Sequence, residues 1–170
     1  LRNNITESKF DRRKLRMSNI GKKDRQLWYS YNGYKGEELM PHTRIKFLYG
    51  HLIEEMVLAL AKLSGHNVTD EQKKAEVDGI KGSMDCKIDG ILTDVKSTST
   101  YGFKKFKEGR LEYDDPFGYI AQLSAYAEAN KDSEAAFFAI DKQSGALALL
   151  QLHQMEMINA EDRIKHLKNI

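Results

Sequence analysis

The chain contains 170 residues, of which 41% are hydrophobic and 31% are charged, and its formal net charge is +2. These values are typical of one soluble globular domain, and so small a charge does not by itself indicate a nucleic-acid partner. The single cysteine, Cys86, excludes an internal disulfide framework and any all-cysteine metal site. No apolar run is long enough to span a bilayer, so we expect a cytoplasmic protein without a membrane partner, although the missing initiator Met at Leu1 leaves room for an upstream segment.

The N-terminal segment, residues 1–41, is rich in Lys and Arg and carries aromatic side chains between residues 10 and 36. We predict one short helix within it, near residues 22–31. A mixture of basic and aromatic side chains suits phosphates and unstacked bases. A solvated basic surface over a packed aromatic cluster explains the same pattern equally well.

A core is expected over residues 42–152. After Pro41, the spacing of apolar residues predicts a helix over 42–65 that ends at Gly65. Its apolar stripe consists of Leu48, His51, Leu52, Glu55, Met56, Ala59 and Leu63. Glu54 lies at the edge of this stripe and Glu55 lies inside it, so either glutamate is a candidate to face the sheet.

The remaining elements follow in chain order: an extended stretch over 67–77, a β-hairpin over 82–97, a basic loop over 97–115, a helix over 117–130, strands over 134–141 and 145–152, and a C-terminal helix over 153–170. This order predicts an α/β fold, with a mixed central β-sheet flanked by α-helices. We expect a single domain over residues 1–170.

The hairpin raises an electrostatic question. Asp89-Gly90 is a typical two-residue turn, and pairing Ile88 with Ile91 across it places Asp85 directly opposite Asp94. Like charges in that position repel each other, so removing Asp94 is expected not to destabilise the protein. A solvated hairpin in which Lys87 and Lys96 neutralise the two aspartates is one explanation.

A divalent cation is the other explanation. Mg²⁺ prefers carboxylate oxygens, and it would convert the repulsion between Asp85 and Asp94 into shared coordination. Lys96 lies on the same strand face as Asp94, where its ammonium group would point at a phosphate or at a water that it helps to activate. Glu54 or Glu55 would add another ligand, and His51 is either a core residue or an extra ligand. Gln122 and Tyr126, four residues apart on one helix, offer an amide and a phenol to the same pocket.

Four short motifs in this order resemble the PD-(D/E)XK nuclease superfamily and its RecB-like branch: Gly50-x-x-x-Glu54, Gly82-x-x-Asp85, Asp94-x-Lys96 and Gln122-x-x-x-Tyr126. The resemblance implies a restriction-endonuclease-like core and Mg²⁺- or Mn²⁺-dependent hydrolysis of DNA, in recombination, repair or phage DNA metabolism. It implies Glu54, Asp85, Asp94 and the Val95 carbonyl as metal ligands and Lys96 as the catalytic lysine. Gln122 and Tyr126 would brace the site or contact the strand. The expected compartment is then the cytoplasm of a bacterial, archaeal or phage-infected host cell.

A second resemblance lies in the segment "LRMSNIGKKDRQLWYS", which is similar to the region of CRISPR-associated adaptation nucleases that holds the first cysteine of an iron–sulfur cluster. Lys23 stands where that cysteine would be, so we expect no iron–sulfur cluster. Packing of Leu27, Trp28 and Tyr29 would hold the segment instead. No phosphate-binding glycine loop of the Gly-x-x-x-x-Gly-Lys type occurs, so no nucleotide cofactor is expected.

We predict a preference for single-stranded DNA or DNA ends, because exposed aromatic side chains stack on unpaired bases. The predicted DNA-binding residues are Arg25, Tyr29, Tyr31, Ser97, Tyr101, Phe103, Lys104, Lys105 and Lys107. Two alternatives remain open: a nuclease-like module that binds DNA without cutting it, and a structural subunit of a larger repair complex with protein partners.

Overall fold

The computed structural model describes residues 14–34, 36 and 38–170. Its centre is a five-stranded sheet in the order β1-β4-β5-β6-β7. The strands are β1 (Val68–Thr69), β4 (Cys86–Ile88), β5 (Ile91–Thr98), β6 (Glu134–Asp141) and β7 (Leu147–His153). Strands β5 and β6 pair in parallel and all other neighbours are antiparallel. The predicted α/β fold with a mixed sheet is therefore confirmed.

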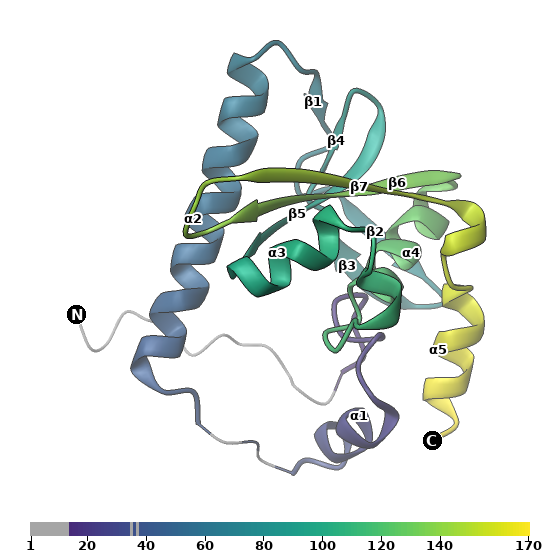
Figure 1. Cartoon of the computed structure of the whole chain (residues 1–170). Coiled ribbons are helices and arrows are strands. Elements are labelled where there is room, and N and C mark those ends of the chain that lie inside the picture. The colour runs from purple at the N-terminus through teal and green to yellow at the C-terminus, as the bar shows by residue number, and fades with distance from the viewer. Residues whose placement is uncertain (1–13, 35, 37) are drawn as a thin grey trace.

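Helices pack against parts of this sheet (Figure 1). They are α1 (Asp24–Tyr31), α2 (Pro41–Leu63), α3 (Thr100–Lys107), α4 (Tyr119–Asn130) and α5 (Ala160–Lys168), with short 3₁₀ turns over Leu111–Tyr113 and Gln154–Glu156. Helices α3 and α4 lie below the sheet in Figure 1 and form the main core with Phe137 and Leu92. Helix α2 runs along one side and forms a smaller core with Val95 and Ile140 of the opposite face. None of the described helices is both long and apolar enough to cross a membrane.

The predicted hairpin is confirmed at its turn and over the three residue pairs next to it. Its outer part is wrong: the pairing ends at Cys86 and Thr93, so Asp85 and Asp94 are not a cross-strand pair, and Gly82 and Ser83 pair with β2 (Lys74–Val77) instead. Cys86 pairs with Thr93 and Ile88 with Ile91. Asp89 and Gly90 have φ angles of 51° and 87°, as the two-residue turn requires. Cys86 is fully buried on the face toward α2, as expected of a small core residue.

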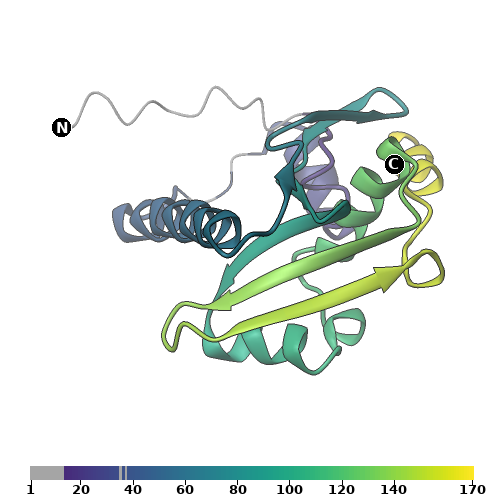
Figure 2. The same ribbon diagram turned by 90° about the horizontal axis from the view of Figure 1, so that it is seen from above.

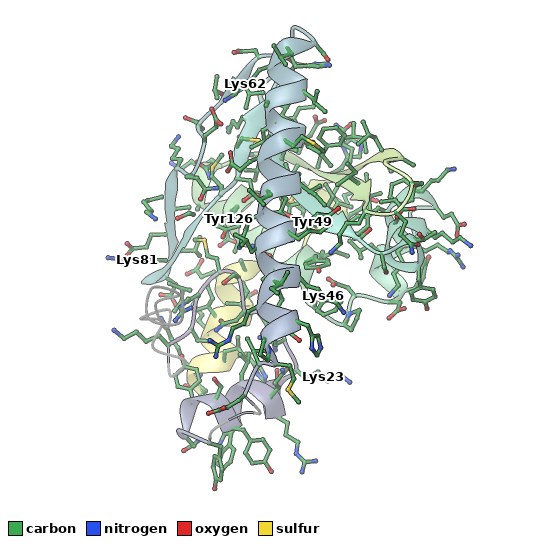
Figure 3. The ribbon with its side chains drawn as sticks, turned by 90° about the vertical axis from the view of Figure 1, so that its left-hand side faces the viewer. Lys23, Lys46, Tyr49, Lys62, Lys81 and Tyr126 are labelled. Atoms are coloured by element: carbon green, nitrogen blue, oxygen red, sulfur yellow. The ribbon has the colours of Figure 1, made fainter. Side chains whose placement is uncertain are left out.

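Helix α2 has the predicted extent but not the predicted orientation. Its end is a Schellman motif, in which the His66 N–H donates to the Ala61 carbonyl and the Gly65 N–H donates to the Lys62 carbonyl. The stripe proposed from the sequence is wrong, because the buried side chains are those of Ile53, Val57, Leu58 and Ala61, together with Gly50. In Figure 3 the outer side of α2, with Tyr49, faces the viewer uncovered by any described element.

One face of the sheet carries no described helix over β6 and β7 (Figure 2). An apolar groove of about 540 Å³ lies there, between α2 and the two strands. Leu149 in β7 and Met56 in α2 line it and are 63% and 48% exposed.

Three further elements differ from the sequence predictions. The extended stretch predicted over 67–77 contains β1 and β2 (Lys74–Val77), and β2 forms a separate hairpin with β3 (Ile80–Ser83). The predicted basic loop contains α3, because Ser99 caps this helix through the Gly102 N–H and burial of Phe103 and Phe106 stabilises it. The C-terminal helix begins at Ala160 and not near His153.

Candidate active site

The site lies where β4 ends and leaves one edge of β5 open. The β4–β5 ladder stops at Cys86 and Thr93, so the next residues of β5 have no strand partner on that side. The Val95 N–H points to this open edge and donates to Asp85 Oδ2 at 2.9 Å. In a β-strand the N–H and C=O of one residue point to the same side, so the Val95 carbonyl faces the open edge as well. The sheet thus presents a backbone oxygen beside an aspartate.

Asp94 and Lys96 lie on the face of β5 that packs toward α4. Lys96 Nζ is 2.5 Å from Asp94 Oδ2, and the two side chains are 16% and 4% exposed. Asp94 Oδ2 accepts no well-aligned hydrogen bond from the described residues, although the Lys96 ammonium lies against it. The pair is therefore a buried ion pair with acceptor capacity left over.

Glu54 reaches the site from α2. The Ser97 hydroxyl of β5 lies 3.4 Å from Glu54 Oε1 and 3.4 Å from the Gly50 carbonyl. A Cβ atom on Gly50 would lie 3.2 Å from Ser97 Oγ, so the glycine lets the helix approach the strand closely. Of the two glutamates, Glu54 contacts β5 and is partly buried, whereas Glu55 is exposed. His51 is not a core residue: its side chain is 78% exposed and its Nδ1 lies 3.4 Å from Glu54 Oε2.

Gln122 and Tyr126 meet on α4 as predicted. A side-chain hydrogen bond joins them, and burial raises the pKa of the Tyr126 phenol. A Cβ atom on Gly82 would lie 2.8 Å from a Tyr126 ring carbon and 2.9 Å from the Met17 Cβ. Gly82 therefore allows β3, α4 and the N-terminal segment to meet closely, and this contact fixes the chain three residues before Asp85.

Burial and neighbouring charges together determine the electrostatics of the site. Burial, followed by the negative charges of Asp94 and Glu54, raises the pKa of Asp85 to about 7, against the opposing effects of Lys96 and the Val95 N–H. Burial by itself would lower the pKa of Lys96, but the charges of Asp94 and Asp85 outweigh it and raise that pKa above its ordinary value. Lys96 is therefore a stable cation, and the pKa of Asp85 is raised mainly by burial and then by the charge of Asp94.

The donor set agrees in chemistry with a hard divalent cation, since it consists of carboxylates and one backbone carbonyl. The raised pKa of Asp85 and the unfilled acceptor capacity of Asp94 are both relieved by a positive charge placed between them. Over residues 14–34, 36 and 38–170, however, no three His, Cys, Asp or Glu side chains converge at distances suited to a metal ion. Each carboxylate instead contacts a neighbour within the protein: Val95 N–H, Lys96 or Ser97.

Of the predicted DNA-binding residues, three lie on α1 at the lower end of the molecule in Figure 1. The Arg25 guanidinium lies 5.7 Å from the Tyr29 ring centre, and Tyr29 and Tyr31 are 39% and 40% exposed. Of the residues expected to hold this segment by packing, Leu27 is buried, whereas Trp28 is 40% exposed and packs edge-on against the Tyr29 ring at 5.3 Å.

Five more predicted DNA-binding residues lie on α3: Tyr101, Phe103, Lys104, Lys105 and Lys107. Phe103 is 5% exposed and belongs to the main core, so it is wrong as a base-stacking residue. Tyr101 is 73% exposed, with Lys105 Nζ 5.2 Å from its ring centre. Lys104 and Lys107 are exposed. Tyr101 and these two lysines are thus available to a ligand.

Sequence reasoning missed Tyr119. Its ring centre lies 5.0 Å from Lys96 Nζ, and burial is the main cause of the raised pKa of its phenol. Tyr119 precedes Gln122 by three residues on α4, and residues at this spacing share one side of a helix. The three-residue spacing from Gln122 is the sequence pattern that would have placed Tyr119 at the site.

Comparison with solved structures identifies the same architecture in exonucleases. The crystal structure of an alkaline exonuclease (LHK-Exo) from Laribacter hongkongensis matches with a TM-score of 0.61 and 15% identity, over 94% of this chain and 90% of that one. LHK-Exo in complex with dAMP matches with a TM-score of 0.58 and 16% identity, over 96% and 93% of the two chains. A phage-related exonuclease from Haemophilus somnus 129PT gives 0.60 and 16%, over 91% and 88%.

No protein-family model matches the sequence, and a search of curated proteins gives no match either. At 15–16% identity the structural matches show a shared fold. The chain therefore has the fold of these exonucleases, and the resemblance to the PD-(D/E)XK nucleases is confirmed at the level of the fold.

Proposed function

We propose that the protein is a metal-dependent deoxyribonuclease, and specifically a RecB-like exonuclease, that hydrolyses DNA phosphodiester bonds in recombination, repair or phage DNA metabolism. The observation that supports it most strongly is the buried Asp94–Lys96 ion pair beside Asp85, at the open edge of β5. This arrangement occurs on a fold that the chain shares with exonucleases.

Asp85, Asp94 and Glu54, with the Val95 carbonyl, are the residues proposed to hold Mg²⁺ or Mn²⁺. The chemistry supplied by such an ion is neutralisation of the phosphate charge and a lower pKa for water at the site. Asp85 would give up its proton on loading, since a carboxylate must be ionised to act as a ligand.

Lys96 acts as a positive charge and not as a base in this proposal. In the protein without metal, the neighbouring carboxylates raise the pKa of Lys96, so its side chain is a cation at neutral pH. Its ammonium group stabilises the negative charge that develops on the phosphate oxygens in the transition state. The Tyr119 ring restricts where that ammonium can lie.

A nuclease-like module that binds DNA without cutting it is the second candidate. It is favoured by one observation: among the described residues, the three carboxylates do not converge at ligand distances. The two candidates differ in whether a strand is broken when metal is added.

The experiment that tests the proposal uses purified wild-type protein and DNA labelled at either end. Single-stranded, blunt duplex and circular substrates are incubated with Mg²⁺, Mn²⁺ or EDTA. We expect short products from linear DNA in either metal, intact circles, and no products in EDTA. A salt-sensitive complex without products in any metal would favour the binding module.

A further inference from the structure

A second feature of the site is a pocket of about 300 Å³ between the end of β5, α3 and the start of α4. Tyr119 lines this pocket and also lies 5.0 Å from Lys96 Nζ. Ser97 lines it as well, and its hydroxyl contacts Glu54 at 3.4 Å. The pocket therefore adjoins the proposed catalytic centre.

Phe117 provides an aromatic surface at this pocket. Its ring stacks on Tyr119 with a centre-to-centre distance of 5.3 Å and an angle of 25°, yet Phe117 remains 63% exposed. An aromatic side chain held by stacking on one partner and open to solvent is suited to stack on a second flat ring.

The segment that carries Phe117 is held at two points. The Asp115 carboxylate accepts hydrogen bonds from the Tyr119 N–H and the Ile120 N–H, both at 2.9 Å. One residue earlier, Asp114 Oδ2 lies 2.5 Å from Lys105 Nζ of α3. Phe117 is thus positioned before any ligand arrives, which lowers the entropy cost of stacking on it.

The polar groups of the pocket match the other parts of a nucleotide. Lys142 lines it and makes no ion pair within the described part of the chain, so its cation is available to an anion such as phosphate. The Asp114 side chain is 53% exposed and offers carboxylate oxygens to the amino groups of a base. The volume is at the lower end of the range for small-ligand sites, about 300 to 1,000 Å³, which suits one base and not a base pair.

We propose that this pocket receives one unpaired base of the DNA strand bound at the catalytic centre, stacked on Phe117, with Lys142 contacting the adjoining phosphate. The proposal rests on the proposed function and gives it a structural basis for strand preference. It assigns stacking to Phe117, in place of Phe103, which is buried.

The test measures DNA binding with the metal chelated by EDTA, so that no strand is cut. Wild-type protein is compared with Phe117→Ala, Phe117→Trp and Tyr113→Ala. Tyr113 is the matched control, because it is 81% exposed in the same segment and does not line the pocket. Thermal unfolding of each variant checks that its fold is intact.

We expect Phe117→Ala to weaken binding of a short single strand by roughly 5- to 150-fold, the range given by loss of one base stack. Phe117→Trp should bind as the wild type does, and Tyr113→Ala should have no effect. Affinity for blunt duplex DNA should stay the same in all variants, because paired bases cannot enter the pocket.

An abasic scan identifies the base that occupies the pocket. Removing that base from the strand should weaken wild-type binding as much as Phe117→Ala does, and should weaken the Phe117→Ala variant no further. Equal affinity of wild type and Phe117→Ala for single strands, or full additivity at every abasic position, would overturn the subsite. If the wild type still cuts DNA in that case, the nuclease proposal stands and only the subsite is wrong.

Discussion

Asp94 is a residue of β5 and Asp85 lies beside the same strand, but the two aspartates have different partners. Asp94 is the close ion-pair partner of Lys96, whereas Asp85 accepts a backbone N–H and carries a raised pKa. In the sequence alone, the two aspartates are equivalent sources of repulsion. We therefore expected that removing Asp94 would not destabilise the protein. The ion pair changes this expectation, because loss of Asp94 leaves a buried cation without its nearest partner.

Opposite effects on stability are therefore predicted for two matched variants in metal-free buffer at pH 8. Asp94→Asn should lower the free energy of unfolding by about 3 kcal/mol, near the low end for a broken buried pair because Asp85 remains close to Lys96. Asp85→Asn should raise it, since the amide keeps an acceptor for the Val95 N–H and removes a crowded charge. Urea denaturation of both proteins measures this. A stabilised Asp94→Asn variant would contradict the assignment of the ion pair.

The raised pKa of Asp85 also predicts how stability depends on pH. Between the ordinary value of 3.8 and about 7, folded Asp85 keeps a proton that the unfolded chain has lost. The folded state thus binds more protons in this window, so the free energy of unfolding attributable to Asp85 falls as pH rises through it. In EDTA, the stability difference between Asp85→Asn and wild type should grow from pH 4 to pH 7. Parallel stability curves would show that Asp85 titrates normally.

At the scale of elements, the start of α4 depends on a close contact between two glycines. A Cβ atom on Gly118 would lie 2.3 Å from backbone atoms of Gly21, while Gly118 itself has a φ of 74°. Gly145 has nearly the same φ, 73°, but a Cβ atom there would meet nothing within 4 Å. The two positions therefore separate backbone strain from steric overlap.

We predict that Gly118→Ala destabilises the protein by about 2 kcal/mol or more beyond Gly145→Ala, because overlap with backbone forces neighbouring segments apart. The Gly145 variant should show only the cost of a left-handed conformation, about 1 kcal/mol. Thermal or urea unfolding of both variants gives the comparison. Equal losses would mean that the Gly21–Gly118 contact is not maintained in solution.

The sequence predicts some elements well because local chemistry determines them. The Asp89-Gly90 turn sets the register of the hairpin, and this register places Asp94 and Lys96 on one face. Local chemistry does not determine which side of α2 is buried. Both sides carry apolar residues, Ile53 and Val57 on the buried side and Leu52 and Met56 on the exposed side, so their spacing predicts either orientation.

Tertiary contacts determine the elements and contacts that local chemistry does not specify. Helix α3 contains a glycine and three lysines, and the sequence therefore favours a loop. Burial of Phe103 and Phe106 against the sheet outweighs this preference, and it removes Phe103 from the set of possible DNA contacts. The contact of Tyr119 with Lys96 likewise depends on how α4 packs on β5, which no local pattern specifies.

At the scale of the whole molecule, the site is assembled from segments far apart in the chain. Glu54 comes from α2, Asp85 and Lys96 from the hairpin, and Tyr126 from α4. The two ends of the described chain are also joined, since Arg163 of α5 donates hydrogen bonds to the carbonyls of Ile20 and Lys22 at 2.9 and 2.8 Å. The geometry of the candidate site therefore depends on the packing of the complete fold.

The proposed role of Lys96 in DNA cleavage can be tested directly, with Lys87 as a matched control. Both are lysines of the same hairpin in ion pairs with aspartates, but Lys87 pairs with Asp132 at 2.7 Å, outside the open edge of β5. Replacing each with alanine removes one paired cation from the hairpin. If the two variants differ in cleavage rate, the difference is due to the position of the lost charge, because both variants lose one paired cation.

The most direct measurement is the single-turnover rate of Mg²⁺-dependent DNA cleavage by wild type, Lys96→Ala and Lys87→Ala, with folding and DNA binding checked for each. We predict that Lys96→Ala is slower than wild type by about 10²- to 10³-fold, as for loss of one transition-state donor, while still binding DNA. Lys87→Ala should cut within about 3-fold of the wild-type rate, since it lies outside the site. A Lys96→Ala protein that cuts at the wild-type rate, or a wild type that cuts equally well in EDTA, would contradict the account.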